Sequence, residues 1–239
     1  MKILVSGCSI SQGYGFPLTI NDPSIWPNLI AKELDGTVTN VSVPGYDNTG
    51  IFLNALKELT TDNYDLILIQ ITSLDRIVVS PTMHCTLNLM GLGPNSLSDN
   101  KTEQDRFFKL FLKINQQFEH WKRLMNIIIS VQNLVKQGYN IKLINGLLHW
   151  NKEFFSTDNS KFAKELIDFH NLPDEDIEKG LVKINRDKAL IDSKIWINLI
   201  NSFGQMQVDN ASLIDNHPGP ESHKIYSKLI LDNLKLETK

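Results

Sequence analysis

Two stretches of the chain carry the residue types that covalent chemistry needs. Near the N-terminus, Ser9 lies in a glycine-rich segment, residues 7–15, directly after an apolar run. Near the C-terminus, Asp215 and His217 stand two positions apart. A serine hydroxyl is a weak nucleophile at neutral pH and needs a neutral imidazole to accept its proton, while a carboxylate orients that imidazole. The three residues suit this chemistry if the fold brings both ends of the chain together; a turn in which Ser9 only caps a helix fits the local sequence equally well.

Four short runs rich in Ile, Leu and Val are the elements expected to position these groups. Each run is continuous rather than alternating, which is typical of parallel strands buried on both faces. Helical spacing of apolar residues lies between them, at residues 24–34 and 48–59. This alternation predicts a three-layer α/β/α fold with a mainly parallel sheet. The strands are expected at residues 2–6, 37–43, 66–71 and 141–144.

The segments that follow these strands are the expected location of a site, because ligands meet an α/β sheet at the carboxyl ends of its strands. Ser9 follows the first strand, Gly45 the second, and Thr72 and Ser73 the third. The glycines after the first strand do not match the G-x-G-x-x-G pattern. A dinucleotide site is therefore not expected.

The first of these segments resembles a block of a known family. Residues 7–13 read Gly-Cys-Ser-Ile-Ser-Gln-Gly, which is similar to the first block of the SGNH (GDSL-like) serine hydrolases, with Cys8 in place of the usual Asp. The resemblance selects Ser9 over Ser6 and Ser11 as the nucleophile. It also implies the flavodoxin-like SGNH fold.

Two further blocks carry the same resemblance. Residues 40–48, Asn-Val-Ser-Val-Pro-Gly-Tyr-Asp-Asn, resemble the second block, whose glycine donates a backbone N–H to the oxyanion, and Gly45 matches that glycine. A turn that needs a special φ angle would also favour Gly45. Residues 215–218, Asp-Asn-His-Pro, resemble the last block, Asp-x-x-His-Pro, shortened by one residue. The resemblance implies that Asp215 and His217 complete the triad.

The third block departs from the family pattern, Gly-x-Asn-Asp, whose Asn side chain is a second oxyanion donor. Here the third strand runs into Thr72, Ser73 and Leu74. Thr72, Ser73 or the amide of Asn48 are the candidates to replace the missing donor, although capping of the following helix is the preferred role of Asn48. Asp75 and Arg76 are expected to form a solvated or structural ion pair. The other histidines have no such context: His223 is expected to be a surface or packing residue, and His84, His120, His149 and His170 have no assigned role.

The remaining segments are expected to belong to one domain, residues 1–239. A helix is predicted over residues 102–137, with an aromatic and aliphatic stripe from Phe107 to Ile128 that is assigned to packing. Residues 77–100, rich in Pro, Gly, Ser and Asn, are predicted to form a lid loop. Residues 150–205 are predicted to be a helical insertion.

The composition excludes several classes of function. The 239 residues are 41% hydrophobic and 21% charged, and the net charge of −3 provides no basic surface for nucleic acid or an anionic membrane. Two cysteines and six scattered histidines suggest neither a disulfide framework nor a zinc motif, so no metal or cofactor is expected. No run reaches the ~18 apolar residues of a membrane span, and the N-terminal run is too short for a signal peptide. A soluble, cytoplasmic protein is expected, with its oligomeric state left open.

The resemblance implies an esterase that cleaves acyl esters of small molecules or carbohydrates, acetyl groups included, through an acyl-serine intermediate. Transfer of the acyl group to another acceptor uses the same intermediate. A catalytically inactive SGNH-like domain that binds a glycan or a protein is the alternative of a different class. An assembly component that uses the stripe from Phe107 to Ile128 as an interface is a further one.

Overall fold

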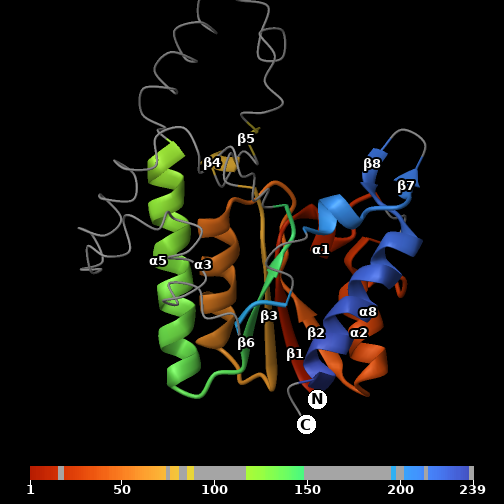
Figure 1. Ribbon diagram of the computed structural model, residues 1–239, viewed down its shortest axis with the longest axis horizontal. Coiled ribbons are helices and arrows are strands. Elements are labelled where there is room, and N and C mark those ends of the chain that lie inside the picture. The colour runs from red at the N-terminus through yellow and green to blue at the C-terminus, as the bar shows by residue number, and fades with distance from the viewer. Residues whose placement is uncertain are drawn as a thin grey trace, which may run out of the picture.

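A parallel sheet lies at the centre of the computed structural model (Figure 1). The structure describes residues 1–15, 19–73, 76–80, 85–88, 117–147, 195–197, 202–212 and 215–236. Four parallel strands follow the order β2-β1-β3-β6. Their bounds are Lys2–Ser6 for β1, Thr37–Asn40 for β2, Leu66–Ile71 for β3 and Ile141–Asn145 for β6.

Helices cover both faces of this sheet (Figure 1). The helices α3 and α5 lie on one face, and α2 and α8 lie on the other. Their bounds are Trp26–Glu33 for α2, Asn48–Leu59 for α3, Gln117–Lys136 for α5 and Pro220–Leu236 for α8. The predicted three-layer α/β/α class with a mainly parallel sheet is confirmed.

The strands β1, β3 and β6 are largely buried because helices cover both faces of the sheet, whereas β2 at the sheet edge is only partly buried. Ile3, Leu4 and Val5 of β1 are fully enclosed, and all six residues of β3 are buried. The register pairs Val5 with Asn40 of β2, and Ser6 with Ile69 of β3. The carboxyl ends of three adjacent strands therefore lie side by side, as the site requires.

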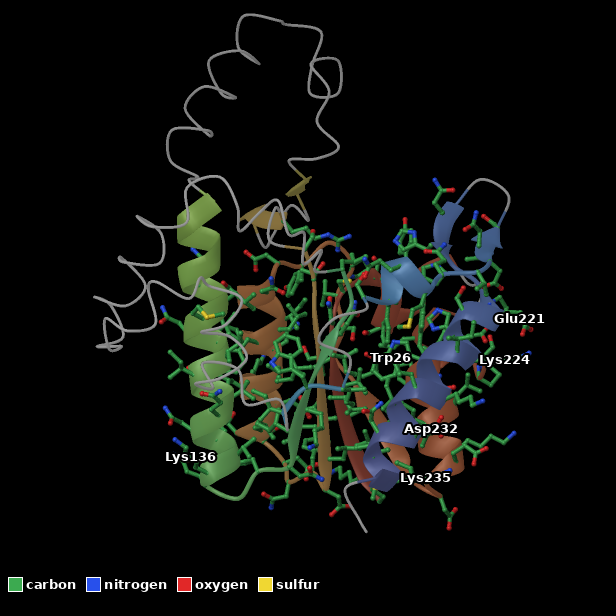
Figure 2. All side chains as sticks on the ribbon, in the orientation of Figure 1. Trp26, Lys136, Glu221, Lys224, Asp232 and Lys235 are labelled. Carbon is green, nitrogen blue, oxygen red and sulfur yellow. The ribbon has the colours of Figure 1, made fainter. Side chains whose placement is uncertain are left out.

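The helix α8 shows how a helix on the surface covers the sheet. Tyr226, Ile230 and Leu231 are buried against the core. On its other side the chain exposes charged residues, shown in Figure 2: Glu221, Lys224, Asp232 and Lys235. This division is that of an amphipathic helix on a globular domain. None of the described helices is long and apolar enough to cross a membrane.

Two predicted boundaries differ from the structure for local reasons. The strand predicted to reach residue 43 ends at Asn40, because the Asn40 side-chain oxygen accepts a hydrogen bond from the Ser42 N–H at 3.1 Å and turns the chain. The cap of α3 is Asp47, whose carboxylate accepts a hydrogen bond from the Gly50 N–H at 2.7 Å. The prediction that Asn48 caps this helix is wrong, since Asn48 is its first residue.

The predicted lid loop contains regular structure in the part that is described. Strands β4, Arg76–Ser80, and β5, Cys85–Asn88, form an antiparallel pair. The rest of residues 77–100 lies outside the described residues, as do Asp75 and thus its expected ion pair with Arg76. Figure 1 shows β4 and β5 beyond the carboxyl end of β3.

Most of the predicted helical insertion and of the aromatic stripe also lies outside the described residues. Within residues 150–205, Trp196 forms a parallel bridge with Leu143 of β6, and the Ile197 N–H donates to the Leu143 carbonyl at 3.0 Å. These residues extend the edge of the sheet, whereas a short 3-10 helix, η5, spans Phe203–Met206 at the end of this range. The helical insertion as a whole stays a prediction. In the stripe, Met125 and Ile128 of α5 are buried in the core, which confirms their assignment to packing.

Candidate active site

The turn after β1 presents Ser9 at the carboxyl end of the sheet. Gly7 and Cys8 lead into the short helix α1, Ser9–Gln12, which begins at the predicted nucleophile. The Ser6 hydroxyl donates to the Ile51 carbonyl at 2.7 Å, and the Ser11 hydroxyl donates to the Gln70 side-chain oxygen. Ser9 is 4% exposed, and its hydroxyl makes no hydrogen bond within the described part of the chain. Of the three serines, Ser9 is therefore the one whose hydroxyl bonds no described residue.

A buried glutamine on β3 supports this turn from below. The Gln70 amide contacts the Cys8 thiol, with Nε2 to Sγ at 3.4 Å, and also accepts the bond from Ser11. A Cβ on Gly7 would lie 2.7 Å from Gln70 Oε1, and one on Gly146 would lie 1.9 Å from Nε2. Both glycines are therefore needed for Gln70 to approach the backbone. The turn that carries Ser9 is fixed by a polar contact with the neighbouring strand.

The loop after β2 lies directly beside this turn. The Val43 N–H donates to the Gly7 carbonyl at 3.1 Å, and the Asn40 amide donates to the Ser11 carbonyl at 2.8 Å. Two residues beyond Val43, Gly45 has a φ of 77°, a left-handed conformation that glycine adopts without strain. The structure thus brings the Gly45 segment next to the Ser9 segment, as the sequence predicted.

At the end of β3, the side chain of Asn48 pairs with the backbone of Thr72. Its Nδ2 donates to the Thr72 carbonyl at 3.1 Å, and its Oδ1 accepts from the Thr72 N–H at 2.7 Å. Asn48 thereby fixes the end of β3. The Thr72 hydroxyl is enclosed and has no hydrogen-bond partner among the described residues, whereas Ser73 is only half-buried.

His217 lies on a hairpin next to the turn that carries Ser9. Strands β7, Asn210–Ser212, and β8, Asp215–Pro218, pair antiparallel, and β8 contacts α1. The His217 ring lies against the Tyr14 ring, with centroids 4.9 Å apart. Because residues two apart in a strand share a face, positions 215 and 217 lie on one face of β8. The side chain of Asp215 is outside the described part of the structure.

The other described histidine, His223, has a different role. It is 1% exposed on α8, and its Nδ1 accepts a hydrogen bond from the Trp26 N–H at 3.1 Å. Desolvation by burial lowers the pKa of His223 to about 4, against the opposing charges of Asp209 and Asp22. His223 is a packing residue, as expected, and not a surface one. The side chains of His84, His120, His149 and His170 are outside the described residues.

Two contributors to the site were missed by sequence reasoning, Tyr14 and Gln70. A glutamine within the apolar run of β3 was an available signal, because a polar side chain in a strand buried on both faces must find a partner. Nothing in the sequence around Tyr14 indicated its contact with His217. The described residues contain no group of three or more His, Cys, Asp or Glu side chains that could hold a metal ion.

The comparisons with known proteins find similarity in structure alone. No protein-family model and no curated protein matches the sequence. The chain is similar to solved structures of the G-D-S-L family, the family that its motifs resemble. One is a member of this lipolytic family from Veillonella parvula, with 15% identity, 97% of each chain covered and a TM-score of 0.44.

Two esterases are also among the similar structures. A psychrotrophic esterase from Pseudoalteromonas sp. has 13% identity, a TM-score of 0.48, and coverage of 99% of this chain and 98% of its own. An acetyl xylan esterase from the rumen bacterium Butyrivibrio proteoclasticus has 14% identity and a TM-score of 0.48, over 99% of this chain and 64% of its own. At these identities the similarity concerns the fold.

Proposed function

We propose that this protein is a serine hydrolase that cleaves acyl esters, with Ser9 as nucleophile and His217 as base. The observation that carries the proposal is the hydroxyl of Ser9, which no described group uses, on a turn that the sheet fixes and that the His217 hairpin contacts. A serine whose hydroxyl bonds no described group, on a turn held in place by its neighbours, is suited to be a nucleophile. The resemblance of the three sequence blocks to SGNH hydrolases supports the same assignment.

In the proposed reaction, the Ser9 oxygen attacks the ester carbonyl carbon while His217 takes the serine proton. The carbonyl electrons move onto the oxygen to form a tetrahedral oxyanion. When they return, the C–O bond to the alcohol breaks, and the imidazolium gives its proton to the leaving alcohol. A water, deprotonated by His217, then hydrolyses the acyl-serine by the same steps. Asp215 is assigned to orient the imidazole.

The oxyanion needs donors that are already oriented when its charge develops. We assign one to the backbone N–H of Gly45, on the loop bonded to the Ser9 turn. Asn48 is less suited to be a second donor, because both ends of its amide engage the backbone of Thr72. The Thr72 hydroxyl is enclosed. The half-buried Ser73 is therefore the second donor that we propose.

The proposed substrate is an acetyl or short acyl ester on a small molecule or carbohydrate. If an acceptor other than water attacks the same acyl-serine, the protein acts as an acyltransferase. A second candidate is a catalytically inactive domain that binds a glycan or a protein. The engagement of Asn48 with Thr72 favours it, because the side-chain amide that was a candidate to replace the missing family Asn already bonds the backbone.

Labelling with a fluorophosphonate distinguishes the two candidates. We expect the probe on Ser9, no labelling and no p-nitrophenyl acetate turnover in Ser9→Ala, and labelling about 10² or more slower in His217→Ala, because a general base contributes about that much. Ser130→Ala is the matched control, since its hydroxyl bonds within α5 to the Asn126 carbonyl. Mass spectrometry locates the probe. A folded protein labelled on Ser6, on Ser11 or nowhere would refute the hydrolase.

A further inference from the structure

The proposed nucleophile and the proposed base are carried by two different sheets of the fold. Ser9 follows β1 of the central sheet, whereas β8, which carries His217, pairs with β7 in a sheet of its own within the described residues. Figure 1 shows this hairpin beyond the sheet, on the side of α1 and α8. Proton transfer needs heavy atoms about 2.6–3.2 Å apart. The contacts between these two parts therefore set the geometry of the reaction.

Tyr14 is bonded to one part and contacts the other. Gly13, with a φ of 76°, ends α1 in a left-handed conformation and turns the chain back. The Tyr14 N–H then donates to the Ser9 carbonyl at 3.0 Å. Its ring lies against the His217 ring at a centroid distance of 4.9 Å and an angle of 53°. Tyr14 thus contacts the backbone of the nucleophile and the ring of the base.

We propose that Tyr14 is a positioning residue that holds the His217 ring against the Ser9 turn, an inference that rests on the proposed function. Tyr14 is 48% exposed, so burial in the core does not account for its aromatic ring. An aromatic ring within about 6 Å of a cation also attracts it. The same ring therefore favours the imidazolium that forms when Ser9 loses its proton. Both effects belong to the ring and not to the phenol hydroxyl.

Three variants separate this role from a general effect on structure. Tyr14→Leu removes the ring, Tyr14→Phe keeps it, and Tyr139→Leu makes the same change at a residue 40% exposed on the turn after α5. In Tyr14→Leu we expect the rate of Ser9 labelling and kcat to fall about tenfold with KM nearly unchanged, as for a misplaced base. Tyr14→Phe should restore both rates. Tyr139→Leu should match the wild type.

A measurement that needs no catalysis tests the contact itself. The nuclear magnetic resonance signals of the His217 ring protons should carry a ring-current shift that disappears in Tyr14→Leu and remains in Tyr14→Phe. Thermal melting confirms that each variant is folded. If Tyr14→Leu unfolds, Tyr14→Met replaces it in every comparison.

The possible failures are distinguishable. Absence of labelling in the wild type would refute the hydrolase, and with it the catalytic consequence of the contact. Labelling of the wild type together with an equal rate in Tyr14→Leu would refute the positioning role alone. If Tyr14→Phe loses as much rate as Tyr14→Leu, the phenol hydroxyl and not the ring is responsible. That result would overturn the proposal.

Discussion

The buried histidine of α8 should make the protein less stable in mild acid. The His223 ring lies against the Tyr226 ring, and its Nδ1 accepts a hydrogen bond from the Trp26 N–H, so its folded form is the neutral imidazole. Protonation would place a donor where an acceptor is needed and would put a charge in a site that is 1% exposed. Figure 2 shows Trp26 on the side of the sheet that α8 covers.

The sign and size of the effect follow from the pKa. The unfolded chain protonates His223 near its ordinary pKa of 6.5, whereas burial lowers the folded pKa to about 4. The unfolded state thus binds the proton first, and stability present above pH 6.5 is lost as the pH falls towards 4. One pKa unit corresponds to about 1.4 kcal/mol, so the shift amounts to roughly 3 kcal/mol in total. The facing carboxylates of Asp209 and Asp22 reduce the loss but do not reverse it.

Urea unfolding between pH 7.5 and 4.5, in the wild type and in His223→Asn, measures this contribution. Asparagine places an acceptor near the position of Nδ1 but does not titrate, and all other ionisable groups are shared by the two proteins. The free energy of unfolding of the wild type minus that of the variant should fall by about 1.4 kcal/mol per pH unit below pH 6.5. A difference that is constant with pH would show that His223 is not held neutral by the fold.

Four further substitutions test the site. Gly45→Ala should lower turnover by about 10² while costing roughly 1 kcal/mol of stability, because alanine is strained at a φ of 77° and the proposed donor moves; kinetics and urea unfolding measure the two. Asn48→Ala should destabilise the protein by about 1–3 kcal/mol, since the N–H and the carbonyl of Thr72 both lose their hydrogen-bond partner. Ser73→Ala should lower kcat with little loss of stability. A loss of kcat in Asn48→Ala and of stability in Ser73→Ala would instead assign the oxyanion donor to Asn48. Gln70→Leu should lower the free energy of unfolding by about 1–3 kcal/mol, because it leaves the Ser11 hydroxyl unpaired. It should also slow the labelling of Ser9. An unchanged labelling rate would show that Gln70 does not position the turn that carries Ser9.

Properties that depend on local pattern could be predicted from the sequence. The strands β1 and β3 lie at the predicted residues, because strands buried on both faces require continuous apolar runs. The helix α3 and the positive φ angle of Gly45 could also be predicted, since helical spacing and a Pro-Gly turn are local features of the sequence. The placement of Ser9, Gly45 and Ser73 at one edge followed from the parallel order of the strands.

The tertiary structure decided which polar groups are already engaged. Each such partnership joins residues far apart in the sequence: Asn48 bonds Thr72 across 24 residues, and Trp26 bonds His223 across 197. The resemblance of the first sequence block selects Ser9, but only the structure shows that the hydroxyls of Ser6 and Ser11 are engaged, by the Ile51 carbonyl and by Gln70. The contact between the rings of Tyr14 and His217 could not be predicted from the sequence either. A hydrogen bond or ring contact depends on distances of a few ångström between segments, and no local pattern specifies those distances.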